Sequence, residues 1–104
     1  MEWETFPEEL EQVYLWNREQ VISLFESHFQ KGSNCLTRDV ADIKSLLESG
    51  EITFEDCPLE TGSKRNWVYR IEAVRFLWYY RQVVEKYGNR AVAKKYITKN
   101  GIPI

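Results

Sequence analysis

The chain has 104 residues, the size of one domain, which is enough to form a hydrophobic core without metals or disulfide bonds. Hydrophobic residues make up 43% of it and aromatic residues 14%, a composition that excludes an intrinsically disordered chain. The net charge is −2, yet residues 1–62 hold 14 acidic and 4 basic side chains, whereas residues 63–104 hold 2 acidic and 10 basic ones. We therefore expect a single domain over 1–104 with two oppositely charged halves. Either these halves pack against each other, or one of them binds a charged partner.

The first predicted element is a helix over about residues 6–31. Thr5 and Glu8 have the spacing of a capping box, in which the side chain of each residue accepts the backbone N–H of the other. Apolar residues follow at helical spacing up to about Lys31. Gly32 is expected to end this helix because glycine readily adopts the left-handed backbone conformation.

A second, shorter helix is predicted over 37–49, with Thr37 as its N-cap and an apolar stripe formed by Val40, Ile43, Leu46 and Leu47. Residues 51–65 contain several turn-forming residues and are expected to be irregular. A short strand or β-bridge in 51–57 is the alternative, because apolar and charged residues alternate there.

The longest predicted element is a helix over 66–87, around which the other helices are expected to pack. It contains no Gly or Pro and has apolar residues on two opposite sides. One side matches a core stripe, and the other consists of Trp67, Ile71, Val74 and Trp78, bordered by Arg70, Arg75 and Arg81. Trp and Arg are typical of interface hot spots, so this second stripe is a candidate protein-binding surface. If helices pack on both sides, the stripe is part of the core.

A final helix is predicted over 90–99, after a turn at residues 88–89. Its basic residues Arg90, Lys94, Lys95 and Lys99 are expected on one side, where they can contact phosphates. Together with the 66–87 helix it has the outline of a helix-turn-helix. However, the helix lacks Ser, Asn and Gln for reading base edges, and the chain as a whole is acidic.

Sequence patterns of catalysis are scarce. The chain has no phosphate-binding glycine loop, no nucleophile elbow and no zinc-binding pair, so we expect neither an enzyme nor a cofactor or metal. The catalytic alternative is a nucleophile pair between His28 and either Cys35 or Cys57. A lone histidine on the inner side of a helix is more typical of packing.

The first residues are acidic and lack the pattern of a secretory signal, and no apolar run approaches the roughly 20 residues that span a bilayer. We therefore expect a cytoplasmic protein without membrane contact, in which Cys35 and Cys57 are reduced thiols. Their pairing in a disulfide is the alternative.

These patterns predict a mainly α-helical protein, a small bundle of about four helices. Its predicted function is that of a non-enzymatic protein-binding module, which docks on a larger protein or protein–nucleic acid complex as inhibitors, immunity proteins and adaptors do. Nucleic-acid binding by the basic half, through residues 66–99, is the first alternative. A nucleic-acid-mimicking acidic surface over 1–62 is the second. A second copy of the chain is a further alternative partner.

Overall fold

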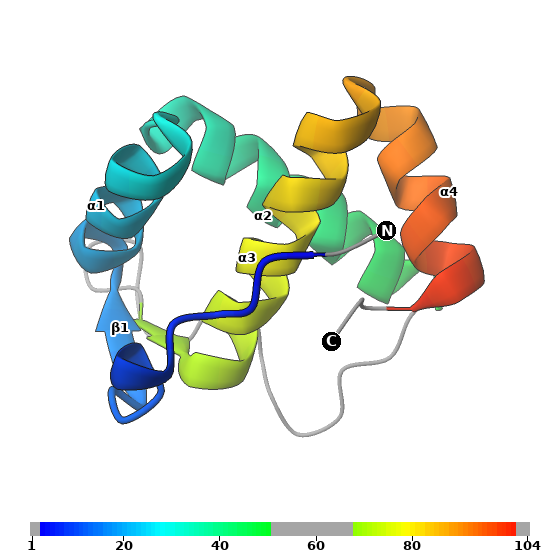
Figure 1. Cartoon of the computed structure of the whole chain (residues 1–104). Coiled ribbons are helices and arrows are strands. Elements are labelled where there is room, and N and C mark those ends of the chain that lie inside the picture. Colours follow the sequence, from blue (N-terminus) through cyan, green and yellow to red (C-terminus); the bar gives the residue numbers. More distant parts are fainter. Residues whose placement is uncertain (1–2, 51–67, 102–104) are drawn as a thin grey trace.

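The computed structural model describes residues 3–50 and 68–101, and it is mainly α-helical (Figure 1). The elements in chain order are a short 3-10 helix Glu8–Leu10, strand β1 Leu15–Asn17, helices α1 Arg18–Phe29 and α2 Ser33–Glu48, strand β2 Val68–Arg70, and helices α3 Ile71–Tyr87 and α4 Arg90–Asn100. The predicted fold class, with four helices, is confirmed. The strand considered for 51–57 lies outside the described residues.

The first predicted helix is wrong in its N-terminal half. The capping box is formed by Asn17 and Gln20, and α1 begins after it. The Asn17 side chain accepts the backbone N–H of Gln20, and the Gln20 side chain accepts that of Asn17, both at 2.8 Å. The preceding residues are held in an extended conformation because β1 pairs with β2. The helix ends at Gln30, which has the left-handed backbone (φ 58°) that was expected at Gly32.

The second helix begins one turn earlier than predicted. Gly32 is its N-cap, and Thr37 lies within it. The Thr37 hydroxyl donates to the carbonyl of Ser33 at 2.9 Å, an interaction within the helix that competes with a capping role. The sequence therefore correctly indicates the apolar stripe of α2 but not its start.

The 66–87 helix is also shorter than predicted, because residues 68–70 form β2 instead of its first turn. β2 pairs antiparallel with β1, with Leu15 opposite Arg70 and Trp16 opposite Tyr69. The backbone N–H of Ile71 donates to the carbonyl of Tyr14 at 2.9 Å and closes the sheet. α3 is thus 17 residues long, close to the 16 of α2, so it is not the markedly longer helix that was expected.

α3 nevertheless lies at the centre of the molecule, with α1 on one side and α4 on the other (Figure 1). Eleven of its residues are buried. The N-terminal segment crosses α3 on the near side in Figure 1. There the ring of Phe6 lies 5.6 Å from that of Trp78, and Trp78 Nε1 donates to the carbonyl of Glu4 at 3.1 Å. Both sides of α3 are therefore covered.

The last helix agrees closely with its predicted range. Gly88 ends α3 with a left-handed backbone (φ 63°), and the Asn89 side chain caps α4 by accepting the N–H of Val92 at 3.2 Å. Ala93 and Ile97 are fully buried, which attaches α4 to the core. Within the described parts of the chain, none of the helices combines the length and apolarity needed to cross a bilayer.

Candidate functional site

The apolar stripe predicted as a protein-binding surface lies in the core. Ile71 is 7% exposed, Val74 0% and Trp78 1%. The rings of Phe29 and His28 lie 5.0 Å and 4.3 Å from that of Trp78, so α1 covers the stripe together with the N-terminal segment. This corrects the interpretation of these three residues as an exposed contact surface. Trp67, the fourth apolar residue of the stripe, lies outside the described residues.

The three arginines predicted to border that stripe have different environments. Arg81 is buried, with only 4% of its side chain exposed. Arg70 and Arg75 stay half-exposed at the surface, where Arg70 lies 3.8 Å from Glu72 and Arg75 lies 3.2 Å from Glu11. Of the predicted interface residues that the structure describes, these two remain accessible to a partner.

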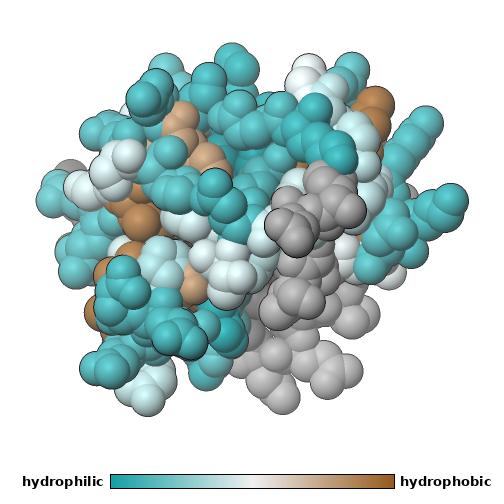
Figure 2. All heavy atoms as spheres, in the orientation of Figure 1, coloured by the Kyte–Doolittle hydropathy of each residue, from teal (hydrophilic) through white to brown (hydrophobic). Residues whose placement is uncertain are grey.

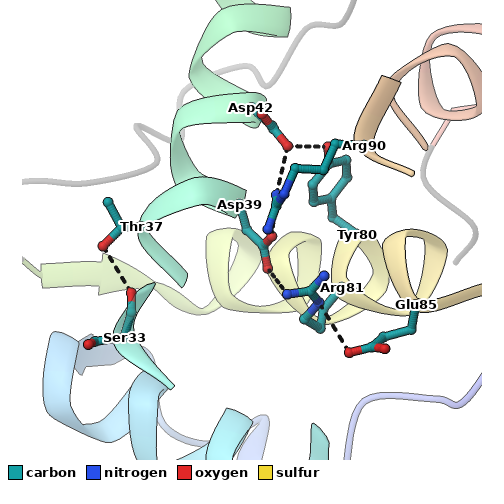
Figure 3. A network of polar contacts seen from close by, with 8 residues as sticks. All are labelled: Ser33, Thr37, Asp39, Asp42, Tyr80, Arg81, Glu85 and Arg90. Atoms are coloured by element: carbon teal, nitrogen blue, oxygen red, sulfur yellow. Dashed lines mark hydrogen bonds and ion pairs between the residues drawn. The ribbon is translucent and has the colours of Figure 1, made fainter. Parts of the chain in front are cut away.

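Arg81 belongs to a cluster of polar side chains that joins three helices (Figure 3). Asp39 and Asp42 lie one turn apart on α2, Tyr80 and Arg81 come from α3, and Arg90 is the first residue of α4. Arg90 Nη1 donates to Asp39 Oδ1 and to Asp42 Oδ2, at 2.8 Å each. The Tyr80 hydroxyl donates to Asp42 Oδ2 at 2.7 Å.

The innermost group of this polar cluster is the carboxyl of Asp39, which is fully buried. Burial raises its pKa to about 6, although the guanidinium groups of Arg81 and Arg90 act in the opposite direction. Burial and the hydrogen bond to Asp42 also raise the pKa of Tyr80. Among the described residues, Asp39 Oδ2 and the Nη1 and Nε atoms of Arg81 lack a hydrogen-bond partner. Arg81 Nη1 lies 3.6 Å from Asp39 Oδ2, and Arg81 Nε lies 3.8 Å from Glu85 Oε1.

The polar cluster links α2 to α3 and α4 through ion pairs and hydrogen bonds. Its charged groups contact one another, and its outer members Arg90 and Asp42 are only 26% and 17% exposed. Asp39 lies in the second turn of α2, because this helix begins before the predicted N-cap Thr37. The signal for the polar cluster was the spacing of Asp39 and Asp42, which places two carboxylates on one side of a helix. The basic partners come from elements that are distant in sequence, and no local pattern indicates them.

The four basic residues predicted to contact phosphates do not share one side of α4. Arg90 is directed into the polar cluster, and Lys94 is half-buried. Lys95 and Lys99 are exposed and lie one turn apart. Only the last two are therefore clearly available to a polyanion.

A different surface stands out where the chain enters strand β1. Tyr14 is 72% exposed and Leu15 is 62% exposed, the two highest values among the large hydrophobic residues that the structure describes. Leu15 lies directly opposite Arg70 on the outer side of the sheet, and Val68 of β2 is half-buried nearby. We call Tyr14, Leu15, Val68 and Arg70 the sheet surface. In Figure 2, small hydrophobic patches lie on the side of the molecule that carries α1 and β1, and hydrophilic residues cover most of the rest of this face.

The catalytic alternative receives no support from the contacts of His28. This side chain pairs with Glu4 and packs on Trp78 and Phe29. In the part of the chain that the structure describes, no contact joins it to Cys35, and no three His, Cys, Asp or Glu residues gather as metal ligands. Cys57 lies outside the described residues.

Comparison with known proteins adds no assignment: no protein-family model, no curated protein and no solved structure gives a significant match to this chain.

Proposed function

We propose that this protein is a non-enzymatic binding module that docks on a larger protein through the sheet surface. The observation that carries this proposal is the exposure of Tyr14 and Leu15, at 72% and 62%, where Leu15 is the first residue of β1 and Tyr14 directly precedes it. Single exposed hydrophobic residues are normal in folded proteins. Two large ones at consecutive positions, where the chain enters a strand, expose apolar surface that an interface would bury.

The position of Leu15 in the sheet also makes its backbone groups available for hydrogen bonds to a partner. The hydrogen bond from Ile71 to Tyr14 fixes the alternation of the antiparallel pair, so the N–H and C=O groups of Leu15 point away from β2. An extended segment of a partner would bind these groups as an added strand, while its apolar side chains cover Leu15 and Tyr14. The proposed occupant is therefore an extended, apolar segment of another protein.

The arginines beside the sheet support the same location. Arg70 is part of the sheet surface, and Arg75 follows on the first turns of α3. Each lies near a glutamate, Glu72 and Glu11 respectively. Half-exposed, ion-paired side chains around an apolar centre correspond to the polar rim of protein interfaces. Arg70 and Arg75, the two predicted interface residues that remain at the surface, are the charged residues that we propose for this rim.

Catalysis is not part of the proposal. The buried charged side chains of Asp39 and Arg81 bind other residues of the polar cluster, so their contacts give no support to a catalytic role. The structure also gives less support to the alternative of a nucleic-acid-mimicking acidic surface over 1–62. Asp39 and Asp42 bind Arg90, and Glu11 binds Arg75, so these three carboxylates have partners inside the chain. The proposed binding therefore depends on apolar contacts at the sheet surface and not on an acidic surface.

The test is affinity capture from nuclease-treated native extract with three forms of the protein: wild type, the double variant Tyr14→Ala with Leu15→Ala, and a control with Tyr87→Ala and Val92→Ala. The control residues are exposed at 37% and 44%, on the opposite half of the chain. We expect one protein to be retained by wild type and control and lost from the β1 variant. Binding of that purified protein should weaken about 30-fold, as expected for removal of a hot spot.

Two outcomes would contradict the proposal. In the first, the β1 variant retains the same proteins as wild type with the same affinity. In the second, sedimentation shows that the wild type forms a dimer and the β1 variant a monomer, which would make a second copy of this chain the occupant of the sheet surface.

A further inference from the structure

Three aromatic rings from distant parts of the chain meet beside α4. The ring centroids of Trp3 and Tyr96 are 5.8 Å apart, and those of Tyr87 and Tyr96 are 5.6 Å apart. Trp3 and Tyr96 are half-buried, and Tyr87 is 37% exposed. Together they form a continuous strip of aromatic surface that the core does not enclose.

Lysines border this strip. The ammonium group of Lys86 lies 5.8 Å from the centre of the Trp3 ring and 5.6 Å from that of Tyr87. Lys95 and Lys99 lie on the exposed side of α4, and Tyr96 lies between them in sequence. We call Trp3, Tyr87, Tyr96, Lys86, Lys95 and Lys99 the basic aromatic surface.

Two of the lysines of this surface, Lys95 and Lys99, lie on α4 in a stretch rich in positive charge. The described stretch from Lys86 to Gly101 contains no acidic residue, and within the described residues neither Lys95 nor Lys99 forms an ion pair. Two carboxylates of α2, those of Asp39 and Asp42, contact Arg90 at the start of α4. The described stretch from residue 86 to residue 101 therefore has an excess of positive charge, although the net charge of the chain is −2.

We infer that the basic aromatic surface binds single-stranded nucleic acid. Unpaired bases stack on exposed aromatic rings, and lysines beside the rings contact the phosphates of the same strand. A duplex does not fit as well, because its bases are already stacked on one another. An acidic protein segment would meet the lysines but would leave the aromatic strip without bases to stack on it. This site is separate from the sheet surface, so either proposal can fail alone.

The experiment measures the fluorescence anisotropy of a labelled oligothymidylate at a series of salt concentrations. The wild type should bind it, with an affinity that falls as salt rises, because each phosphate contact releases counterions. Lys95→Glu with Lys99→Glu should remove binding at all salt concentrations. Tyr87→Ala should weaken binding roughly tenfold. Tyr87→Phe should bind like the wild type, since stacking needs the ring and not the hydroxyl.

A charge-matched control separates this site from general attraction. Lys31→Glu with Arg38→Glu changes the net charge equally but lies on the α1–α2 half of the chain. It should bind like the wild type. The inference is overturned if this control loses as much affinity as the α4 variant, if Tyr87→Ala changes nothing, or if the wild type does not bind the oligonucleotide even at low salt. Equal affinity for a DNA duplex, or for polyglutamate in competition, would also overturn it.

Discussion

Arg81 of α3 and Asp39 of α2 form an ion pair inside the protein, with Arg81 Nη1 3.6 Å from Asp39 Oδ2 and exposed fractions of only 4% and 0%. Taking two charges out of water is costly, and their attraction repays that cost only when the geometry is good. Here the second oxygen of Asp39 also accepts a hydrogen bond from Arg90, at 2.8 Å. One carboxylate therefore holds basic residues of two other helices.

Replacing one residue of the buried Arg81–Asp39 pair should destabilise the protein by more than the pair as a whole stabilises it. We expect Arg81→Met to lower the free energy of unfolding by about 3–5 kcal/mol, because Asp39 would lose a buried countercharge. Arg75→Met is the matched control, since its pair with Glu11 is half-exposed and should contribute less than about 1 kcal/mol. Urea unfolding of both variants measures the difference. Equal, small losses would show that the buried pair is not a stabilising clamp.

Asp39 should also make stability depend on pH. Its pKa is about 6 in the folded protein, against 3.8 in the unfolded chain, so the folded state favours the protonated carboxyl. The stabilisation that this preference gives is complete below about pH 4 and is lost as the pH rises through about 6. The difference in unfolding free energy between wild type and Asp39→Asn should therefore fall by up to about 3 kcal/mol from pH 4 to pH 7. Chemical denaturation at several pH values measures it, and a difference that rises with pH would refute this sign.

Trp78→Ala tests whether this side chain is core. Because Trp78 is 1% exposed and packs on Phe6, Phe29 and His28, we expect a loss of about 3–5 kcal/mol in unfolding free energy. Tyr14→Ala, at a residue that is 72% exposed, should change stability by no more than about 0.5 kcal/mol. Thermal melts of the two variants provide the comparison. A folded Trp78→Ala protein with unchanged stability would contradict this assignment.

The start of α1 can be tested by two substitutions. Asn17→Ala removes the side chain that caps the helix and should cost about 1 kcal/mol. Thr5→Ala should have no comparable effect, since the helix does not start there. Circular dichroism during urea unfolding reports both. The opposite order of effects would support the capping box that the sequence first indicated at Thr5 and Glu8.

The sequence predicted helices well where an apolar stripe and local end signals agree. The stripe of Val40, Ile43 and Leu46 and the end of α3 at Gly88 are examples. It failed where a strand interrupts a helical pattern. Residues 15–17 and 68–70 read as helix on their own, and their pairing is a contact between segments more than 50 residues apart. Local periodicity contains no information about such a contact.

The candidate sites were harder to predict for a related reason. Two apolar sides on one helix are compatible with a core helix or with an interface, and only the positions of Phe6 and Phe29 against Trp78 decide between them. Likewise, the charge of Arg90 was visible in the sequence but not its binding to Asp39 and Asp42. The exposure of Tyr14 and Leu15 follows from the strand that interrupts the predicted helix, so no local pattern indicates these two residues.

The most direct test of the docking proposal is a photo-crosslinker placed on the sheet surface. Leu15 would be replaced by benzoylphenylalanine in the cell, with the same replacement at Thr98 as a control on an exposed part of α4. We expect one specific cross-linked protein from position 15 that is absent from position 98. It is contradicted if position 15 cross-links to nothing, or if it cross-links only to a second copy of this chain.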